Sequence, residues 1–424
     1  MLVLLLVALG CEREPEVPDS PRLILIGIDG ASPRIVEPLL AEGRLPNLAK
    51  IAASGVYGRL RSEMPIYSPR IWNTIATGKT PAKHGIISFF FKGEDEKHHL
   101  YASTDRRTPA LWSIADDAGF RVGVVNLWNT YPLENVDGVM VSDHVLAKEL
   151  EARRKMTGVD DEAEVGAVIH PDEWATRLDG MVQGNATPLP GFPSPFAADR
   201  VLPHWAPRDE FQRRFDEDGA LARMAQEIST VEAPDVMMVL LTGIDRICHH
   251  IWGVVEPPEL YPPALVPTDE ERAGGLAALH EYYEYTDALI GALIEDFGPD
   301  DLVMVVSDHG FEAAKGLYTL TGGHDTQNAV DGVIFAAGRG IVPGVEPGEV
   351  SVYDVAPTLL AWLGLPVARD MDGRVASFLH VEEVASIETY DTIVPEFLNA
   401  SEVPSGVEGD IVDQLKALGY VGPE

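Results

Sequence analysis

Five uninterrupted apolar runs constrain the fold of this chain more than any other feature of its sequence. The first is Arg22–Asp29 (RLILIGID), and the others lie at residues 120–127, 235–242, 301–307 and 332–337. Apolar runs without polar alternation are typical of parallel strands that are buried on both faces. Helical patterns lie between several of the runs, at residues 46–54, 108–118, 276–297 and 352–363. This alternation predicts an α/β fold with a mostly parallel central sheet sandwiched by helices.

The rhythm of strands and helices breaks between residues 148 and 233, where the chain is rich in charge and proline. We interpret 148–233 as an inserted cap or lid region. The main α/β domain then comprises residues 22–147 and 234–380. Residues 381–424 form a C-terminal extension, in which Asp410–Gly419 is amphipathic enough for a short helix.

Residues 1–21 predict an export signal followed by a tether. The apolar stretch Met1–Gly10 is too short to span a bilayer, and Cys11 and a polar, proline-rich segment follow it. The stretch resembles a bacterial lipoprotein signal, in which the cysteine becomes lipidated. We expect an exported, periplasmic or cell-surface lipoprotein; the alternative is an ordinary signal peptide shortened by a misassigned start codon.

The charge balance restricts the partners of the protein. The 424 residues include 67 acidic and 32 basic side chains, which gives a formal net charge of −35. A nucleic-acid-binding face is excluded, because such binding relies on Lys and Arg that replace counterions on the phosphates. An anionic substrate of this chain needs another source of attraction, and bound metal cations supply one.

Carboxylates follow three of the apolar runs. Asp29 ends the first run, Asp308 follows the run at 301–307, and Asp245 lies shortly after the run at 235–242. A single aspartate in such a place is usually a turn or cap residue. Three of them predict a ligand site, because the carboxyl ends of parallel strands meet in one crevice.

Three histidines accompany these carboxylates. His249 is four residues after Asp245, which on a helix places both side chains on one face; His309 follows Asp308 directly, and His324 lies on a glycine-rich segment. Carboxylate and imidazole ligands favour zinc, with manganese and iron as alternatives, over calcium or magnesium. His250 would point about 100° away from His249 and is not expected to be a ligand.

Ser68 is the candidate nucleophile. It precedes Pro69 at the start of a predicted helix that Gly78 ends. One interpretation is that Ser68 only caps the helix. The other is that it attacks phosphorus at a helix N-terminus, where negative charge is stabilised. Spacing alone leaves both open.

Taken in order, these motifs resemble the alkaline phosphatase superfamily and, within it, the type I phosphodiesterase/nucleotide pyrophosphatase family. The resemblance covers Leu23 to about Val375 and also includes Leu45–Ala49 (LPNLA), Pro81–Ile86 (PAKHGI) and Tyr353–Leu360 (YDVAPTLL). It implies a two-metal hydrolase of phosphate esters, diesters rather than monoesters, that forms a covalent intermediate on Ser68. The implied ligands are Asp29, Ser68, Asp308 and His309 for one ion, and Asp245, His249 and His324 for the other.

Two departures from the family pattern concern the substrate, which we expect to be a small phosphate ester. The family's phosphate-contacting Asn after the His-Gly-Ile motif is replaced by Ile87–Phe91, and Asn73, Lys83 or an insertion residue remain as substitutes. Pro69 directly follows Ser68, which departs from the sulfatase signature. A phosphoryl transferase or mutase, a sulfatase-like hydrolase and a non-catalytic metal-binding lipoprotein stay as alternatives; the metal identity, natural substrate and oligomeric state are left open.

Overall fold

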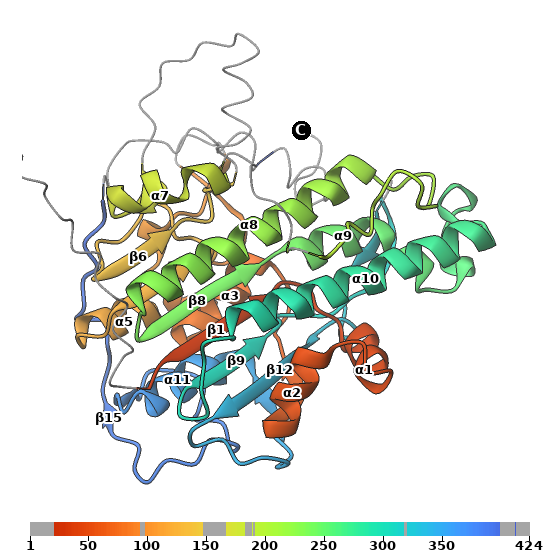
Figure 1. Cartoon of the computed structure of the whole chain (residues 1–424). Coiled ribbons are helices and arrows are strands. Elements are labelled where there is room, and N and C mark those ends of the chain that lie inside the picture. Colours follow the sequence, from red (N-terminus) through yellow and green to blue (C-terminus); the bar gives the residue numbers. More distant parts are fainter. Residues whose placement is uncertain are drawn as a thin grey trace, which may run out of the picture.

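The computed structural model describes residues 21–93, 98–146, 167–182, 189, 191–317, 320–398 and 412. Its centre is a nine-stranded sheet in the order β13-β2-β12-β9-β1-β8-β5-β6-β7 (Figure 1). The strands of this sheet are β1 (Leu23–Ile28), β2 (Gly55–Arg61), β5 (Val122–Val125), β6 (Gly138–Val141), β7 (Ile169–His170), β8 (Val236–Leu241), β9 (Leu302–Val306), β12 (Asp331–Gly338) and β13 (Val350–Ser351).

The middle of the sheet is parallel. β1 pairs in parallel with β8 on one side and with β9 on the other, so that Ile26 lies between Val239 and Val305. β5 continues the parallel arrangement beyond β8. All five predicted runs form strands, but the run at 332–337 becomes β12, which is antiparallel to both β9 and β2. The prediction of a mostly parallel α/β sheet is confirmed.

Helices cover both faces of the sheet (Figure 1). Side chains of β1 alternate between two apolar cores: Ile24, Ile26 and Ile28 face one, and Leu23 and Leu25 face the other. The first core is formed with α1 (Pro33–Ala41), α2 (Pro46–Ser54), α8 (Arg208–Glu232), α9 (Gly243–Ile251) and α10 (Asp269–Leu293). The second is formed with α3 (Ser68–Thr77), α5 (Leu111–Asp117) and α11 (Val355–Trp362).

The predicted insertion contributes the edge strand β7, helix α7 (Asp172–Val182) and the whole of α8 to the described structure. α8 packs against β8, β5 and α10, so this part of the segment belongs to the helical layer over one face of the sheet (Figure 1). The domain boundaries at 148 and 233 stay a prediction. The predicted leader lies outside the described residues, and so does the predicted helix at 410–419, of which only residue 412 is described.

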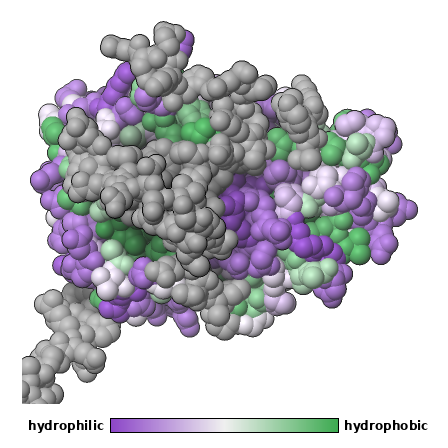
Figure 2. All heavy atoms as spheres, turned by 90° about the horizontal axis from the view of Figure 1, so that it is seen from above, coloured by the Kyte–Doolittle hydropathy of each residue, from purple (hydrophilic) through white to green (hydrophobic). Residues whose placement is uncertain are grey.

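Short elements complete the fold. α4 (Pro81–His84) follows α3; β3 (Phe90–Lys92) pairs with β4 (His98–Leu100), β10 (Glu312–Leu317) with β11 (Leu320–Gly323), and β14 (Val367–Ala368) with β15 (Ser386–Ile387). Where Figure 2 shows described residues, hydrophilic side chains surround smaller hydrophobic patches. None of the helices in the described ranges combines the length and the apolar character that crossing a bilayer requires.

Candidate active site

The ends of three neighbouring strands bring the predicted carboxylates together. Asp29 follows β1, Asp308 lies two residues after β9, and Asp245 lies in the first turn of α9, which begins just after β8. Because β9, β1 and β8 are adjacent and parallel, their carboxyl ends meet at one edge of the sheet. All seven predicted site residues lie there, and none is more than 4% exposed to solvent.

Asp29, Asp308 and His309 form one group. The Nε2 atom of His309 lies 3.4 Å from Asp29 Oδ1 and 3.6 Å from Asp308 Oδ2. The ligand atoms of the three residues all lie within 4.8 Å of one another, which is close enough for one cation. The arrangement fits the first implied ligand set.

Asp245 is the centre of a second group. Its Oδ1 atom lies 3.3 Å from His249 Nε2, 3.8 Å from His309 Nε2 and 4.0 Å from His324 Nε2. His309 therefore faces both groups, whereas the family resemblance places it in the first set alone. The two groups share His309 and lie side by side. From here on we use the name metal cluster for the candidate ligands Asp29, Ser68, Asp245, His249, Asp308, His309 and His324.

The backbone fixes how two of the histidines face the cluster. The Nδ1 atom of His249 lies 3.1 Å from the carbonyl oxygen of Gly322, and that of His309 lies 2.9 Å from the carbonyl of Gly310. An Nδ1–H that donates to a carbonyl leaves Nε2 with the lone pair that a metal needs. Gly322 suits this contact, because a Cβ there would come within 2.2 Å of the carbonyl oxygen of Cys248.

Ser68 begins α3 and points toward the cluster. Its hydroxyl donates a hydrogen bond to Asp29 Oδ1 at 3.3 Å. The N-cap position belongs to Tyr67, one residue earlier than the expected cap, and no side chain caps the helix. Ser68 therefore makes no capping hydrogen bond, and its hydroxyl instead contacts Asp29 at the positive end of a helix.

The electrostatics of the cluster call for an added cation. Burial raises the pKa of Asp308 well above its usual range, and the nearby charge of Asp29 raises it further. Burial alone would lower the pKa of His309, but Asp308, Asp29 and Asp245 raise it to about 10. In the protein without metal, a proton on His309 thus takes part of the role of a cation.

Unsatisfied atoms show where the cation would bind. Asp245 Oδ1, Asp308 Oδ2 and His309 Nε2 are buried without a hydrogen bond among the described residues. Buried polar atoms are usually satisfied, so three such atoms in one place need an explanation. Oxygen and imidazole nitrogen donors at this spacing fit divalent ions of the zinc class.

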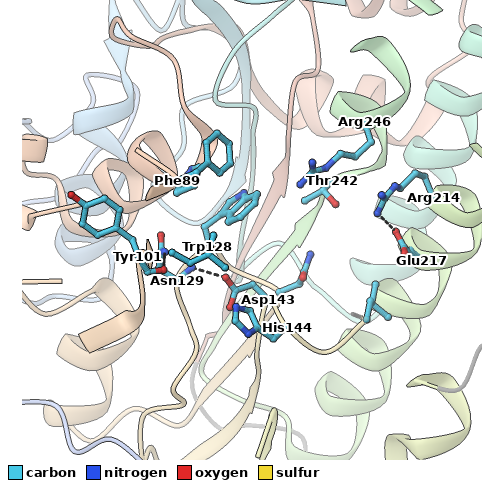
Figure 3. Close-up of a pocket in the computed structure, with 14 residues that line it drawn as sticks. Phe89, Tyr101, Trp128, Asn129, Asp143, His144, Arg214, Glu217, Thr242 and Arg246 are labelled. Carbon is cyan, nitrogen blue, oxygen red and sulfur yellow. Dashed lines mark hydrogen bonds and ion pairs between the residues drawn. The ribbon is translucent and has the colours of Figure 1, made fainter. Parts of the chain in front are cut away.

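A pocket adjoins the cluster and contains residues that the sequence reasoning missed (Figure 3). Pro69 lies next to Ser68, Thr242 is the N-cap of α9, and Arg246 lies within that helix. Trp128 donates from Nε1 to Asp29 Oδ2 at 3.3 Å. Trp128 follows β5, the fourth parallel strand of the site edge. The apolar run at 120–127 was the available signal for it, since the carboxyl ends of the parallel strands β9, β1, β8 and β5 meet at the same edge of the sheet.

Among the residues proposed as substitutes for the family's Asn, Asn73 and Lys83 are engaged in other contacts, whereas Arg214 and Glu217 of the insertion line the pocket. Asn73 is buried within α3 and donates to the carbonyl oxygen of Pro69 and to Asn129 Oδ1, both at 2.7 Å. Lys83 donates to Asp372 Oδ1 at 2.6 Å. The ring of His250 lies against Phe211, with centroids 6.3 Å apart, which agrees with its exclusion from the ligands.

His84, from the PAKHGI motif, forms a hydrogen bond with a side chain of α3. Its Nε2 lies 3.1 Å from Thr74 Oγ1, and its Nδ1 accepts from the backbone N–H of Ile86. Burial, together with the charges of Arg106 and Arg70, lowers the pKa of His84 to about 3. A neutral His84 thus helps to fix α3 and, with it, the position of Ser68.

Comparisons with known proteins show the family and the fold of the chain. The model of the family described as type I phosphodiesterase / nucleotide pyrophosphatase matches residues 23–352. In the comparison with curated proteins, none matches the sequence.

Solved structures with a similar fold include a putative sulfatase from Bacteroides thetaiotaomicron VPI-5482, with a TM-score of 0.52 and 14% identity over 84% of this chain and 74% of that chain. A 2-O GAG sulfatase has a TM-score of 0.51 and 15% identity over 84% of this chain and 73% of that chain. Human ectonucleotide pyrophosphatase / phosphodiesterase 5 has a TM-score of 0.49 and 12% identity over 83% and 97%. The two sulfatases show the likeness of the fold alone.

Proposed function

The chain belongs to the type I phosphodiesterase / nucleotide pyrophosphatase family of the alkaline phosphatase superfamily, and on this premise we propose that it is a two-metal phosphodiesterase with Ser68 as nucleophile. Membership makes it a phosphoryl hydrolase of this superfamily. The observation that carries the finer proposal is the position of the Ser68 hydroxyl, 3.3 Å from a carboxylate of the metal cluster and at the N-terminus of α3.

In this proposal the residues of the metal cluster form two sets of ligands, one for each ion. Asp29, Asp308 and His309 would hold one ion beside Ser68, and Asp245, His249 and His324 would hold the other, with His309 between them. Two bound divalent cations supply charge stabilisation for both the attacking and the leaving oxygen of an in-line displacement. Zinc is the proposed metal, with manganese and iron as alternatives.

The reaction has two displacements. In the first, Ser68 Oγ forms a bond to phosphorus, the bond from phosphorus to the leaving oxygen breaks, and the proton lost by the hydroxyl is balanced by one gained by the leaving alcohol. In the second, a water oxygen bonds to phosphorus, the bond to Oγ breaks, and Ser68 regains a proton. The N-terminus of α3 stabilises the negative charge that develops on the phosphoryl group in both steps.

A diester is favoured over a monoester because the site has room for a second substituent. The pocket beside Ser68 extends from Pro69 past Trp128 to Arg246 (Figure 3). In a diester this pocket could hold the substituent that stays on phosphorus, which agrees with a family described by its phosphodiesterase activity.

Hydrolysis of matched esters tests the proposal. Metal-loaded protein is assayed on an aryl phosphodiester, an aryl phosphomonoester and an aryl sulfate, beside Ser68→Ala and the control Ser229→Ala in α8. We expect the diester to be the best substrate and Ser68→Ala to lose activity on the order of 10³-fold or more. Full activity in Ser68→Ala would overturn the mechanism, and a preference for the sulfate would favour the sulfatase-like alternative. Transfer of phosphate to an added alcohol would favour the transferase.

We also propose export with lipid attachment at Cys11, which rests on the sequence of residues 1–21 alone. The mass of the mature N-terminus in a bacterial host tests it, with Cys11→Ser as the control. A mature chain that begins elsewhere without lipid would contradict this proposal and leave the chemistry of the cluster untouched.

A further inference from the structure

The pocket beside the metal cluster has two unlike walls (Figure 3). One wall is aromatic: Phe89 packs edge-on against Trp128, with centroids 5.6 Å apart, and Tyr101 lies on the same side. The other wall is polar and carries Thr242 and Arg246. A substituent on phosphorus that enters this pocket meets both walls.

Arg246 is the unusual member of the polar wall. It is only 9% exposed, and its Nη1 atom is buried without a hydrogen-bond partner among the described residues. Other buried arginines of the molecule are paired: Arg106 Nη2 lies 2.6 Å from Glu134 Oε1, and Arg214 Nη1 lies 2.6 Å from Glu217 Oε2. In the described part of the chain, Arg246 has no such acidic partner.

The direction of Arg246 separates it from the metal cluster. It follows Asp245 in α9, so its side chain leaves the helix about 100° away from that of the cluster carboxylate. Its guanidinium carbon lies over the ring of Trp128, 5.9 Å from the ring centroid, while the indole N–H of Trp128 donates to Asp29. Trp128 therefore connects the cluster with Arg246, and the guanidinium is aimed at the pocket.

The buried Nη1 atom of Arg246 has lost contact with water and gains no hydrogen bond in the described structure, so only the contact with the Trp128 ring offsets part of the loss. An anionic group of a ligand would take the place of the lost water. Its hydrogen bonds to the charged guanidinium would be stronger than those between neutral groups. We propose that Arg246 and Trp128 form a subsite for an anionic group on the substituent that the hydrolase retains. The substrate class is then a phosphodiester whose second substituent has a flat apolar body, for the aromatic wall, and a carboxylate or phosphate at its far end.

This inference rests on the proposed phosphodiesterase, and a pair of synthetic diesters tests it. Both carry p-nitrophenol as leaving group; the retained substituent is phenyl in one and 4-carboxyphenyl in the other. We expect kcat/KM of the wild-type protein to favour the carboxylate by about tenfold or more. In Arg246→Met this ratio should fall to about one, Arg246→Lys should keep part of it, and the exposed-arginine control Arg61→Met should keep all of it.

The ratio distinguishes this role from others. If Arg246 bound the transferred phosphoryl group, or served only the fold, Arg246→Met would lower both rates by the same factor and leave the ratio intact. Either that result or a wild-type ratio near one overturns the subsite.

A binding experiment separates failure of the subsite from failure of the proposed function. The phenyl and 4-carboxyphenyl esters are titrated calorimetrically into metal-loaded Ser68→Ala protein, which does not turn them over. Tighter binding of the carboxylate that Arg246→Met abolishes supports the subsite even if the wild-type protein hydrolyses neither ester. Equal binding of both esters, with hydrolysis that depends on Ser68, overturns the subsite and retains the phosphodiesterase.

Discussion

Two buried charged regions contact the same helix and differ in how their charges are balanced. The metal cluster surrounds the start of α3 at Ser68. The second region, which we call the Arg106 network, consists of Arg106, Glu134, Asn73, Trp112 and Ser113 and holds the middle of α3 through Asn73. Side chains of Arg106 and Glu134 are 2% and 3% exposed, so burial is nearly the same in both regions.

The Arg106 network satisfies its own charges. Both carboxylate oxygens of Glu134 accept hydrogen bonds: Oε1 from Arg106 at 2.6 Å and from Trp112 at 3.1 Å, and Oε2 from Ser113 at 2.6 Å. The metal cluster instead gathers three carboxylates and leaves oxygen atoms of Asp245 and Asp308 without a hydrogen bond. Removing one partner of a balanced buried network leaves an uncompensated charge and is destabilising, whereas an unbalanced cluster indicates a site for an ion from solution.

The largest difference should appear in activity when one carboxylate of each region becomes an amide. Asp245→Asn removes the charge that faces three histidines, so we expect loss of bound metal and about a 10⁴-fold loss of kcat/KM, equivalent to roughly 5 kcal/mol. Glu134→Gln keeps every ligand and should lose less than about tenfold at a temperature where it remains folded. Elemental analysis and diester hydrolysis measure both. Normal metal content and rate in Asp245→Asn would remove the functional distinction between the regions.

The free energy of unfolding should depend on the Arg106 network more than on the metal cluster, which is the reverse of the expectation for activity. Glu134→Gln leaves the buried Arg106 guanidinium without its counter-charge, so the free energy of unfolding should fall by about 4 kcal/mol. Asp308→Asn in the chelated protein should leave it unchanged or raise it. The reason is that a carboxyl whose folded pKa is raised stabilises below its unfolded pKa and loses that contribution as pH rises. Urea unfolding at pH 8 with a chelator compares the pair, and a fall in both variants would contradict the contrast.

Added metal should stabilise the protein through the metal cluster and not through the Arg106 network. A cation that binds only the folded chain adds about 2.7 kcal/mol to the free energy of unfolding at a hundred times its dissociation constant. Wild-type and Glu134→Gln proteins should both gain this amount on zinc addition, and Asp245→Asn should gain little. Binding should also weaken as pH falls and release protons, since His309, with a pKa of about 10, holds a proton that the metal displaces. Calorimetric titration in two buffers measures that release.

The sequence predicted the metal cluster better than the Arg106 network, for a physical reason. The three carboxylates of the cluster come shortly after the parallel strands β1, β8 and β9. Because the carboxyl ends of such strands meet at one edge of a sheet, Asp29, Asp245 and Asp308 were predictable from the sequence. Arg106 and Glu134 are 28 residues apart in irregular segments, and no periodicity relates them. An ion pair between two such segments depends on how they pack in three dimensions, which the sequence pattern does not show.

The same reasoning explains the smaller errors. The antiparallel direction of β12 has no signature in a short apolar run, which fits a buried strand of either direction. The predicted helix at 276–297 begins earlier, at Asp269, because Thr268 and Glu271 form a capping box that apolar periodicity does not reveal. Arg246 was passed over beside Asp245 because its importance depends on lacking a partner, which only the surrounding structure shows.

A third buried charge, just after the end of α3, gives the mildest test of the comparison. Lys79 is 2% exposed and donates to Asp370 and to Asp391, both at 2.7 Å, so it resembles the balanced network rather than the cluster. Asp391→Asn keeps the second carboxylate, and we therefore expect the free energy of unfolding to fall by only about 1 kcal/mol at pH 7.

The pH dependence of that loss identifies its cause. Burial alone would raise the pKa of Asp391, but hydrogen bonds from Lys79 and Thr108 lower it below 3.8. A carboxyl with a depressed folded pKa stabilises above its unfolded pKa, and the contribution is lost as pH falls through the folded value. The difference between wild-type and Asp391→Asn proteins should thus persist from pH 7 down to the ordinary pKa of an aspartate, and disappear only as the pH falls on through the lower pKa of folded Asp391. A difference that stays constant at low pH would mean that the variant acts through packing, and Lys79 would then no longer belong with the charge-balanced region.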